Sequence, residues 1–373
     1  MIEKDDDFFA GKRPWSVIKD QILGNYMSPY IAKVNKRGQP ILLIDGYAGP
    51  GEFEDGKPGS PLIMCRVAEK FATGNWTAIF INKERKYYNK LNQVIHREGW
   101  SKSVTTILDD STKLLQQLPT QIKSQSVFLY LDPFGPTGCD FALLQPFLKR
   151  NPAYSTEIFL TMNMPGMHRL ATPKAVKAGR QDEEMIKGFH QKLTNVFGGD
   201  YWKDILWKDS DAEVKEHELL EAYLKRLASY LPYTRSCPVR EKTSRRIKYF
   251  VVFASHHRDS LVLLNDIMVR AYFAEMHRAD FVTGLWEDTD WREMRSTDGL
   301  ENIIIDTVSK HPGEKRKFLW FRVVDKHFMR YLESEYINIV QQLVDSKKLM
   351  SPTPHKTKRL NDECQLFPGT LSV

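Results

Sequence analysis

The sequence predicts an α/β fold with a doubly wound, Rossmann-like sheet, and three observations support this prediction. Apolar runs of strand length alternate with helical segments through the first half of the chain, which is typical of a parallel sheet with helices on both faces. Two of these runs, 41–45 and 127–132, end in an aspartate. The first is followed by a glycine-rich turn and then a helix start. Because ligands of such sheets lie at the carboxyl ends of the strands, we expect a binding site there.

The composition is that of an ordinary globular protein, with 373 residues, 42% of them hydrophobic and 27% charged. This length allows two domains. No apolar run reaches the roughly 20 residues of a membrane span, and the N-terminus has no signal-peptide pattern, so we expect a cytoplasmic protein that contacts no membrane. The four cysteines are far apart, which fits a reducing compartment and argues against a metal site. The net charge of +7 permits a polyanionic partner.

The first elements in the chain are a helix and a strand. Residues 14–37 carry apolar side chains at spacings of three and four, which predicts a helix that Pro29 kinks or splits. The run 41–45 is short, apolar and bounded by turn residues, so it predicts a buried strand. Ser60 is a good N-cap for the next helix, which we expect over 61–71.

The loop over residues 46–51 has the glycine spacing G-x-x-G-x-G. A dinucleotide-binding loop has the spacing G-x-G-x-x-G, so the pattern instead favours the looser loop of S-adenosylmethionine-dependent methyltransferases. Asp45 would then accept hydrogen bonds from the amino group of the cofactor, and the glycines would allow the backbone to approach it closely. The alternative is a tight turn without a ligand. The residues expected to bind the cofactor here are Asp45, Gly46, Tyr47, Ala48, Gly49, Gly51 and Ser60.

The next two strands are expected to complete the cofactor site. The second strand, over 76–81, leads into Asn82, with Glu84 two residues further on, and one of these side chains would contact the ribose hydroxyls. Asp109 and Asp110 follow the third strand and would border the adenine. The alternative for Asp109 is the N-cap region of the next helix. The third strand and the helices on either side of it are expected at 104–108, 85–96 and 112–118.

The fourth strand ends in Asp132-Pro133-Phe134, which resembles the Asp-Pro-Pro-Tyr/Phe signature of methyltransferases that modify exocyclic amino groups of bases. Such an amine is a poor nucleophile because its lone pair is delocalised into the ring. A carboxylate and a rigid backbone carbonyl that both accept from the amine make this lone pair available. Asp132 and the carbonyl of Pro133 are placed for this role, and Phe134 is placed to stack on a base. The alternative is a strand that ends in a Pro-Gly turn.

A largely helical insertion over 164–246 follows a fifth strand at 157–162. The insertion begins with a basic stretch that either contacts phosphates or forms a solvated helix face; its members are Arg169, Lys174, Lys177 and Arg180. Two strands are expected to close the sheet as an antiparallel edge pair, and His256 and His257 after them suit a turn better than a metal site. The remaining expected elements are helices at 141–148, 182–197, 211–230 and 260–275 and the edge strands at 235–240 and 247–254.

The expected domains are a methyltransferase-like α/β domain over 1–275, a linker over 276–298 and a C-terminal domain over 299–373. In the last, three helices precede a basic hairpin around 353–359, which is typical of a winged helix. Such a unit places its third helix in the major groove of DNA and its wing on the backbone. A protein-contact or dimerisation domain is the alternative. The three helices are expected at 300–309, 321–329 and 333–346.

Several of these motifs together resemble the three-Cys-motif partner (TcmP) family, over about residues 15–275. The matching segments are Lys19…Tyr26, Ile44-Asp-Gly-Tyr-Ala-Gly-Pro-Gly51, Gly59-Ser-Pro-Leu62, Leu131-Asp-Pro-Phe-Gly135 and Tyr249-Phe-Val-Val-Phe-Ala-Ser255. The resemblance implies a Rossmann-like methyltransferase fold and a separate partner protein with a three-cysteine motif that is similar to radical S-adenosylmethionine enzymes. Relatives tend to have an acid where this chain has Asn82, which bears on the ribose contact.

The first functional hypothesis is therefore a methyltransferase that uses S-adenosylmethionine to modify a base amino group of DNA or RNA. The second is a non-catalytic protein on the same scaffold, which binds nucleic acid or docks a partner. A third, weaker hypothesis is a metal-dependent nuclease that uses Asp45, Asp132 and a neighbouring acid, although no acidic cluster has nuclease spacing.

Overall fold

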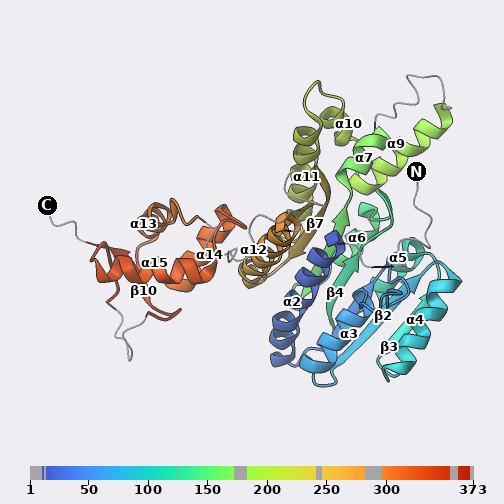
Figure 1. Cartoon of the computed structure of the whole chain (residues 1–373), viewed down its shortest axis with the longest axis horizontal. Coiled ribbons are helices and arrows are strands. Elements are labelled where there is room, and N and C mark those ends of the chain that lie inside the picture. The colour runs from blue at the N-terminus through green and yellow to red at the C-terminus, as the bar shows by residue number, and fades with distance from the viewer. Residues whose placement is uncertain are drawn as a thin grey trace. The chain divides into compact units, whose positions relative to one another are not determined.

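The computed structural model describes residues 11, 14–122, 124–171, 183–240, 246–281, 296–352 and 360–369. Most of the expected linker, the tip of the expected wing (353–359) and the basic residues Lys174, Lys177 and Arg180 lie outside these ranges. The chain forms two compact units, residues 1–257 and 258–373, which are coloured from blue to yellow and from orange to red in Figure 1. In the described part of the chain, no helix combines the length and the apolar character that crossing a bilayer requires.

Unit 1 is built on a seven-stranded sheet in the order β3-β2-β1-β4-β5-β7-β6. The first five strands in this order run parallel, and β7 is antiparallel to both of its neighbours. This confirms the doubly wound, Rossmann-like sheet and its antiparallel edge pair. The strands are β1 (Ile41–Asp45), β2 (Trp76–Asn82), β3 (Val104–Leu108), β4 (Ser126–Leu131), β5 (Thr156–Met162), β6 (Tyr233–Arg240) and β7 (Ile247–Ser255).

Helices cover both faces of this sheet because alternate residues of each strand point to opposite faces. On β4, Val127 and Leu129 belong to the core beneath the later helices, whereas the ring of Phe128 contacts Tyr26 of α2 on the other face. The first face carries α2 (Pro14–Lys36) and α3 (Ser60–Phe71), with α4 (Arg85–Arg97) beside β2 and β3. The second carries α5 (Ser111–Gln121), α6 (Phe141–Leu148), α7 (Met164–Ala171), α9 (Glu183–Phe197), α10 (Tyr201–Leu206) and α11 (Ala212–Ala228).

One expectation about the helices of unit 1 is corrected, because Pro29 does not split α2, which continues from Pro14 to Lys36. The helices of the insertion share the core of the sheet, since Leu193, Trp202 and Leu220 are buried in it. Its short helices α7 and α10 were not expected, because a helix of one or two turns shows too little periodicity in the sequence.

Unit 2 begins at Arg258, so its boundary differs from the expected one after residue 275. The helix α12 (Arg258–Phe281) packs against α14, and its Asn265 bonds both to the carbonyl of Tyr331 (2.8 Å) and to the amide of Met329 (2.7 Å). The same helix extends into the expected linker. The other elements are α13 (Leu300–Lys310), β8 (Glu314–Lys315), α14 (Arg316–Lys326), α15 (Glu333–Asp345), β9 (Leu349–Met350) and β10 (Gln365–Pro368), with the antiparallel strand order β8-β10-β9.

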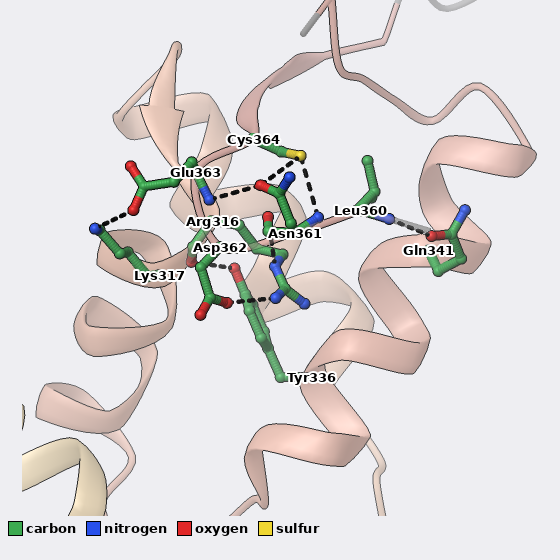
Figure 2. A network of polar contacts seen from close by, with 9 residues as sticks. All are labelled: Arg316, Lys317, Tyr336, Gln341, Leu360, Asn361, Asp362, Glu363 and Cys364. Atoms are coloured by element: carbon green, nitrogen blue, oxygen red, sulfur yellow. Dashed lines mark hydrogen bonds and ion pairs between the residues drawn. The ribbon is translucent and has the colours of Figure 1, made fainter. Parts of the chain in front are cut away.

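A polar network around Arg316 joins the turn before β10 to two helices (Figure 2). The guanidinium is buried and donates to Asp362 and, through Nε, to the carbonyl of Asn361 (3.1 Å). Tyr336 of α15 donates to the carbonyl of Arg316 (3.0 Å). The thiol of Cys364 accepts from the amide of Asn361 and donates to its side-chain oxygen. The network therefore connects α14 and α15 to the turn that precedes β10. The assignment of this unit as a winged helix stays a prediction.

Candidate functional site

A cavity lies at the edge of the sheet where β1, β4 and β5 end and β7 begins. Its wall includes residues 47–53 of the glycine-rich loop, Tyr130 and residues 132–135 at the end of β4, and Ser16, Lys19 and Asp20 near the start of α2. All of these residues belong to unit 1. The cavity therefore occupies the place where open α/β sheets bind their ligands.

The backbone of the glycine-rich loop packs against β4 and is hydrogen-bonded by Asn82. Gly49 and Gly51 have positive φ angles of 61° and 80°, which favour glycine. A Cβ on Gly46 would lie 2.6 Å from the side chain of Leu131, so this glycine lets the loop pack directly on β4. Asn82 donates from its side-chain amide to the carbonyl of Gly49 (2.9 Å). The expected loop residues Tyr47, Ala48, Gly49, Gly51 and Ser60 reach the cavity wall, and Gly46 lies behind it.

Asp45 does not face the cavity and is completely buried. One carboxylate oxygen accepts from the amide of Tyr47 (2.9 Å), and the other accepts from the hydroxyl of Ser60 (2.6 Å). Burial raises its pKa to about 7, although the hydrogen bonds from Ser60 and Tyr47 lower it. Asp45 therefore connects the loop to the start of α3 and is not part of the cavity wall.

The four side chains expected to border the ribose and the adenine also lie away from the cavity wall. Asn82 is buried against the loop, and Glu84 is exposed just before α4. Asp110 is the N-cap of α5 and accepts from the amide of Thr112 (2.9 Å). The hydrogen bonds from the hydroxyl and the amide of Thr112 lower the pKa of Asp110 to about 2. Asp109 is exposed and accepts from the amide of Asp110 (2.7 Å), so the helix-cap alternative is the better description of this pair.

Asp132, Pro133 and Phe134 lie together on the cavity wall, as expected. The carboxylate of Asp132 is half-buried and forms an ion pair with Lys19 of α2 through Oδ2. The side chain of Phe134 is 53% exposed. The site thus offers a carboxylate held by an ammonium, with an aromatic ring at its edge.

Lys19 is a site residue that the chemistry of the sequence did not single out, although it lies within a segment of the family resemblance. It is 8% exposed and stands on the buried face of α2, three residues before Ile22. Burial alone would lower its pKa, but the charges of Asp132, Asp20 and Asp45 and the hydrogen bond to Asp132 together raise it. A lysine within the apolar stripe of a helix is the signal that could have revealed it.

Tyr130 and Tyr249 complete this wall and were likewise not expected at the site. The hydroxyl of Tyr130 is buried and has no hydrogen-bond partner within the described residues. Burial is the main reason that the pKa values of both phenols lie well above their ordinary value, and the negative charge of Asp132 adds to it. Tyr130 lies near the end of β4, and Asp132 follows the strand directly; both side chains line the cavity.

The described residues contain no group of three or more His, Cys, Asp and Glu side chains that could hold a metal ion. Of the two aspartates that the nuclease hypothesis combined, Asp132 lines the cavity and Asp45 does not.

Comparison with known proteins gives similarity in structure alone. No family model and no curated protein matches this chain. An O-methyltransferase from Bacillus cereus, solved in complex with SAH, is 14% identical and is matched over 62% of this chain and 79% of its own length, with a TM-score of 0.34. A methyltransferase from Geobacter sulfurreducens is 11% identical over 61% and 76% of the two chains, with a TM-score of 0.30. These similarities are weak, and the description of the site rests on its own geometry.

Proposed function

We propose that this protein is an S-adenosylmethionine-dependent methyltransferase that acts on an amino group of a nucleic-acid base. The observation that carries the proposal is the meeting of three features in one cavity: the glycine-rich loop, the Lys19–Asp132 ion pair and the ring of Phe134. The loop supplies backbone groups for a cofactor, and the other two supply the groups that an amine acceptor requires.

The residues on the cavity wall fit the proposed cofactor. The loop over 47–51 presents its backbone to the cavity, and its glycines allow a ligand to approach this backbone closely. When bound, the cofactor would supply an electrophilic methyl group. We assign its binding to residues 47–51 and Ser60, without a contribution from Asp45.

The acceptor amine is assigned to Asp132, Pro133 and Phe134. Lys19 bonds Oδ2 of Asp132, which leaves Oδ1 to accept a hydrogen bond from the amine and later its proton. The carbonyl of Pro133 would accept the second amine hydrogen, and Phe134 would stack on the base. The ion pair with Lys19 holds the carboxylate of Asp132 in place on the cavity wall.

The partner protein belongs to the same proposal. The resemblance of the sequence to the three-Cys-motif partner family supports a functional association with a protein that has a three-cysteine motif and is similar to radical S-adenosylmethionine enzymes. Co-purification of such a protein with the full chain, in a cell that contains both, is the outcome that would support it.

The proposal is tested by calorimetric titration with S-adenosylmethionine and SAH, followed by transfer of labelled methyl groups to DNA and to RNA. We expect micromolar binding in the wild type. Asp132→Asn should lower methyl transfer about 100-fold or more and leave the SAH affinity almost unchanged. Asp140→Asn is the matched control, because Asp140 is half-buried in the same loop but absent from the cavity wall. Equal transfer by the wild type and Asp132→Asn would refute the assignment of Asp132.

A second candidate function is a non-catalytic nucleic-acid-binding or partner-docking protein on the same scaffold. The observation that favours it concerns Asn82, which was expected to contact the ribose. Its side-chain amide instead donates a hydrogen bond to the carbonyl of Gly49. This candidate predicts that neither S-adenosylmethionine nor SAH binds, while nucleic-acid binding persists and weakens steeply with salt.

A further inference from the structure

A hydrogen bond connects the two loops that meet in the cavity. The phenol hydroxyl of Tyr47, in the glycine-rich loop, donates to the carbonyl of Gly138, in the loop that follows β4. The second loop also carries Pro133 and Phe134. Burial raises the pKa of Tyr47 above its ordinary value, so the phenol keeps its proton and remains a donor. The bond therefore connects the loop assigned to the cofactor with the loop assigned to the acceptor.

The loop that follows β4 has few hydrogen bonds of its own backbone. In the described part of the chain, no hydrogen bond between two backbone groups holds residues 135–138, and the side chain of Phe134 is exposed. A loop with few backbone hydrogen bonds and exposed side chains has low local stability. The positions of Pro133 and Phe134 therefore depend on the bond that Tyr47 makes to this loop.

The contact between the two loops is also close. The amide of Tyr47 donates to the buried carboxylate of Asp45 (2.9 Å), which fixes the tyrosine at its backbone. A Cβ on Gly138 would lie 2.7 Å from the hydroxyl of Tyr47 and 3.0 Å from the Cβ of Pro133. Gly138 also has a φ angle of 115°, which favours glycine. Since no space separates the two loops here, a displacement of one of them must move the other.

We propose that Tyr47 is a positioning residue that couples the two loops, so that the cofactor and the nucleic acid bind cooperatively. This inference rests on the proposed function. Residues 47–51 would be restricted when the cofactor occupies the cavity, and the hydroxyl of Tyr47 would restrict residues 133–138 with them. The nucleic acid would then meet an ordered loop, and the entropy of ordering it would not be lost a second time. Because such coupling is reciprocal, bound nucleic acid would raise the cofactor affinity by the same factor.

The test compares the nucleic-acid affinity of the full chain with and without SAH. Fluorescence anisotropy with labelled single-stranded DNA and RNA probes measures this affinity, first without SAH and then at a concentration that saturates each variant. Tyr47→Phe removes only the hydroxyl. Gly138→Ala displaces the phenol from the other loop and changes no residue of the cavity wall. Tyr336→Phe is the matched control, because the hydroxyl of Tyr336 also donates to a backbone carbonyl but belongs to unit 2.

We expect SAH to raise the probe affinity of the wild type about fivefold or more, and that of Tyr47→Phe and Gly138→Ala less than about twofold. The double variant should lose no more of the SAH effect than either single variant, because both changes break the same contact. Gly138→Ala should bind SAH alone within about threefold of the wild-type affinity, and Tyr336→Phe should keep the full effect of SAH.

An equal effect of SAH on the wild type and on Tyr47→Phe would overturn the role of Tyr47, and so would a loss of this effect in Tyr336→Phe. If the wild type bound both SAH and a probe but independently of each other, the coupling would be wrong and the proposed function would stand. Absence of SAH binding by the wild type, or of binding to both probes, would overturn the proposed function itself, and the coupling with it.

Discussion

Asp45 and Asp132 both follow a buried apolar strand, yet only Asp132 reaches the cavity. The two strands are neighbours in the sheet, so the sequence pattern around the two aspartates is alike and their surroundings decide their roles. Asp45 bonds the amide of Tyr47 and the hydroxyl of Ser60, and it is completely buried. Asp132 meets an ammonium from α2. The first carboxylate shapes the loop, and the second is available for chemistry.

Replacement of Asp45 by asparagine should stabilise the protein increasingly as the pH rises. The folded protein keeps a proton on Asp45 up to about pH 7, whereas the unfolded chain loses it near pH 4. The contribution of Asp45 to stability is therefore complete below pH 4 and is lost as the pH rises to about 7. Asparagine keeps the shape and carries no charge. The gain of Asp45→Asn over the wild type should grow by about 2–3 kcal/mol between pH 5 and pH 8, measured by denaturant unfolding.

Asp110→Asn provides the control for this measurement. The pKa of Asp110 is lowered to about 2, chiefly by hydrogen bonds from Thr112, so its stabilising contribution is present above pH 4 and is lost only as the pH falls toward 2. The difference between Asp110→Asn and the wild type should therefore stay constant between pH 5 and pH 8. If the difference for Asp45→Asn were equally constant, the proton on Asp45 would not be part of the folded state.

The strands and long helices of unit 1 could be predicted from the sequence because local patterns specify them. The run 104–108 and the helix over 141–148 were predicted with the bounds that the structure has. The position of Lys19 in an apolar stripe could have been noticed, but its ion pair with Asp132 could not be predicted, because the two residues are far apart in the chain. The same limit applies to Asn82, whose side-chain amide donates to the backbone carbonyl of Gly49. Local patterns thus located the site but not all of the side chains that form it.

The turn before β10 should depend on Arg316 at the first position of α14. The side chain of this arginine is buried, and it holds Asp362 and the carbonyl of Asn361 with one planar group (Figure 2). Arg316→Ala removes hydrogen bonds from a charged donor, at a cost of about 2 kcal/mol. Hydrogen exchange of the β10 amides should then be faster by about 30-fold. Arg316→Lys should not restore slow exchange, because an ammonium cannot replace the planar fork.

Lys317→Ala is the matched comparison for Arg316. Lys317 is the next residue in the chain, and it pairs with Glu363 of the same turn, but both side chains are exposed. An exposed ion pair contributes little to stability, so hydrogen exchange of β10 should not change. Faster exchange of the same size in both variants would mean that the buried position of Arg316 gives it no special role.

The two units differ in charge, although both were expected to take part in nucleic-acid binding. Residues 1–257 contain 37 Lys and Arg against 29 Asp and Glu, a net charge of +8, and residues 258–373 contain 17 against 18, a net charge of −1. Phosphate contacts supply most of the affinity for nucleic acid, and they require positive charge. The positive charge of the whole chain therefore lies in the unit that holds the cavity. The near-neutral charge of unit 2 favours the alternative of a protein-contact domain for it.

The fragment 1–257 should therefore keep both the cofactor affinity and most of the nucleic-acid affinity of the full chain. All the residues that line the cavity lie between Ser16 and Tyr249, so SAH binding should stay within about threefold. The slope of log affinity against log salt, measured by fluorescence anisotropy with single-stranded and duplex probes, reports the number of phosphate contacts, and it should be the same for the fragment and the full chain. The complementary fragment 258–373 should bind both probes weakly. A full salt slope in fragment 258–373, lost from 1–257, would instead assign the phosphate contacts to the C-terminal unit and support its interpretation as a winged helix.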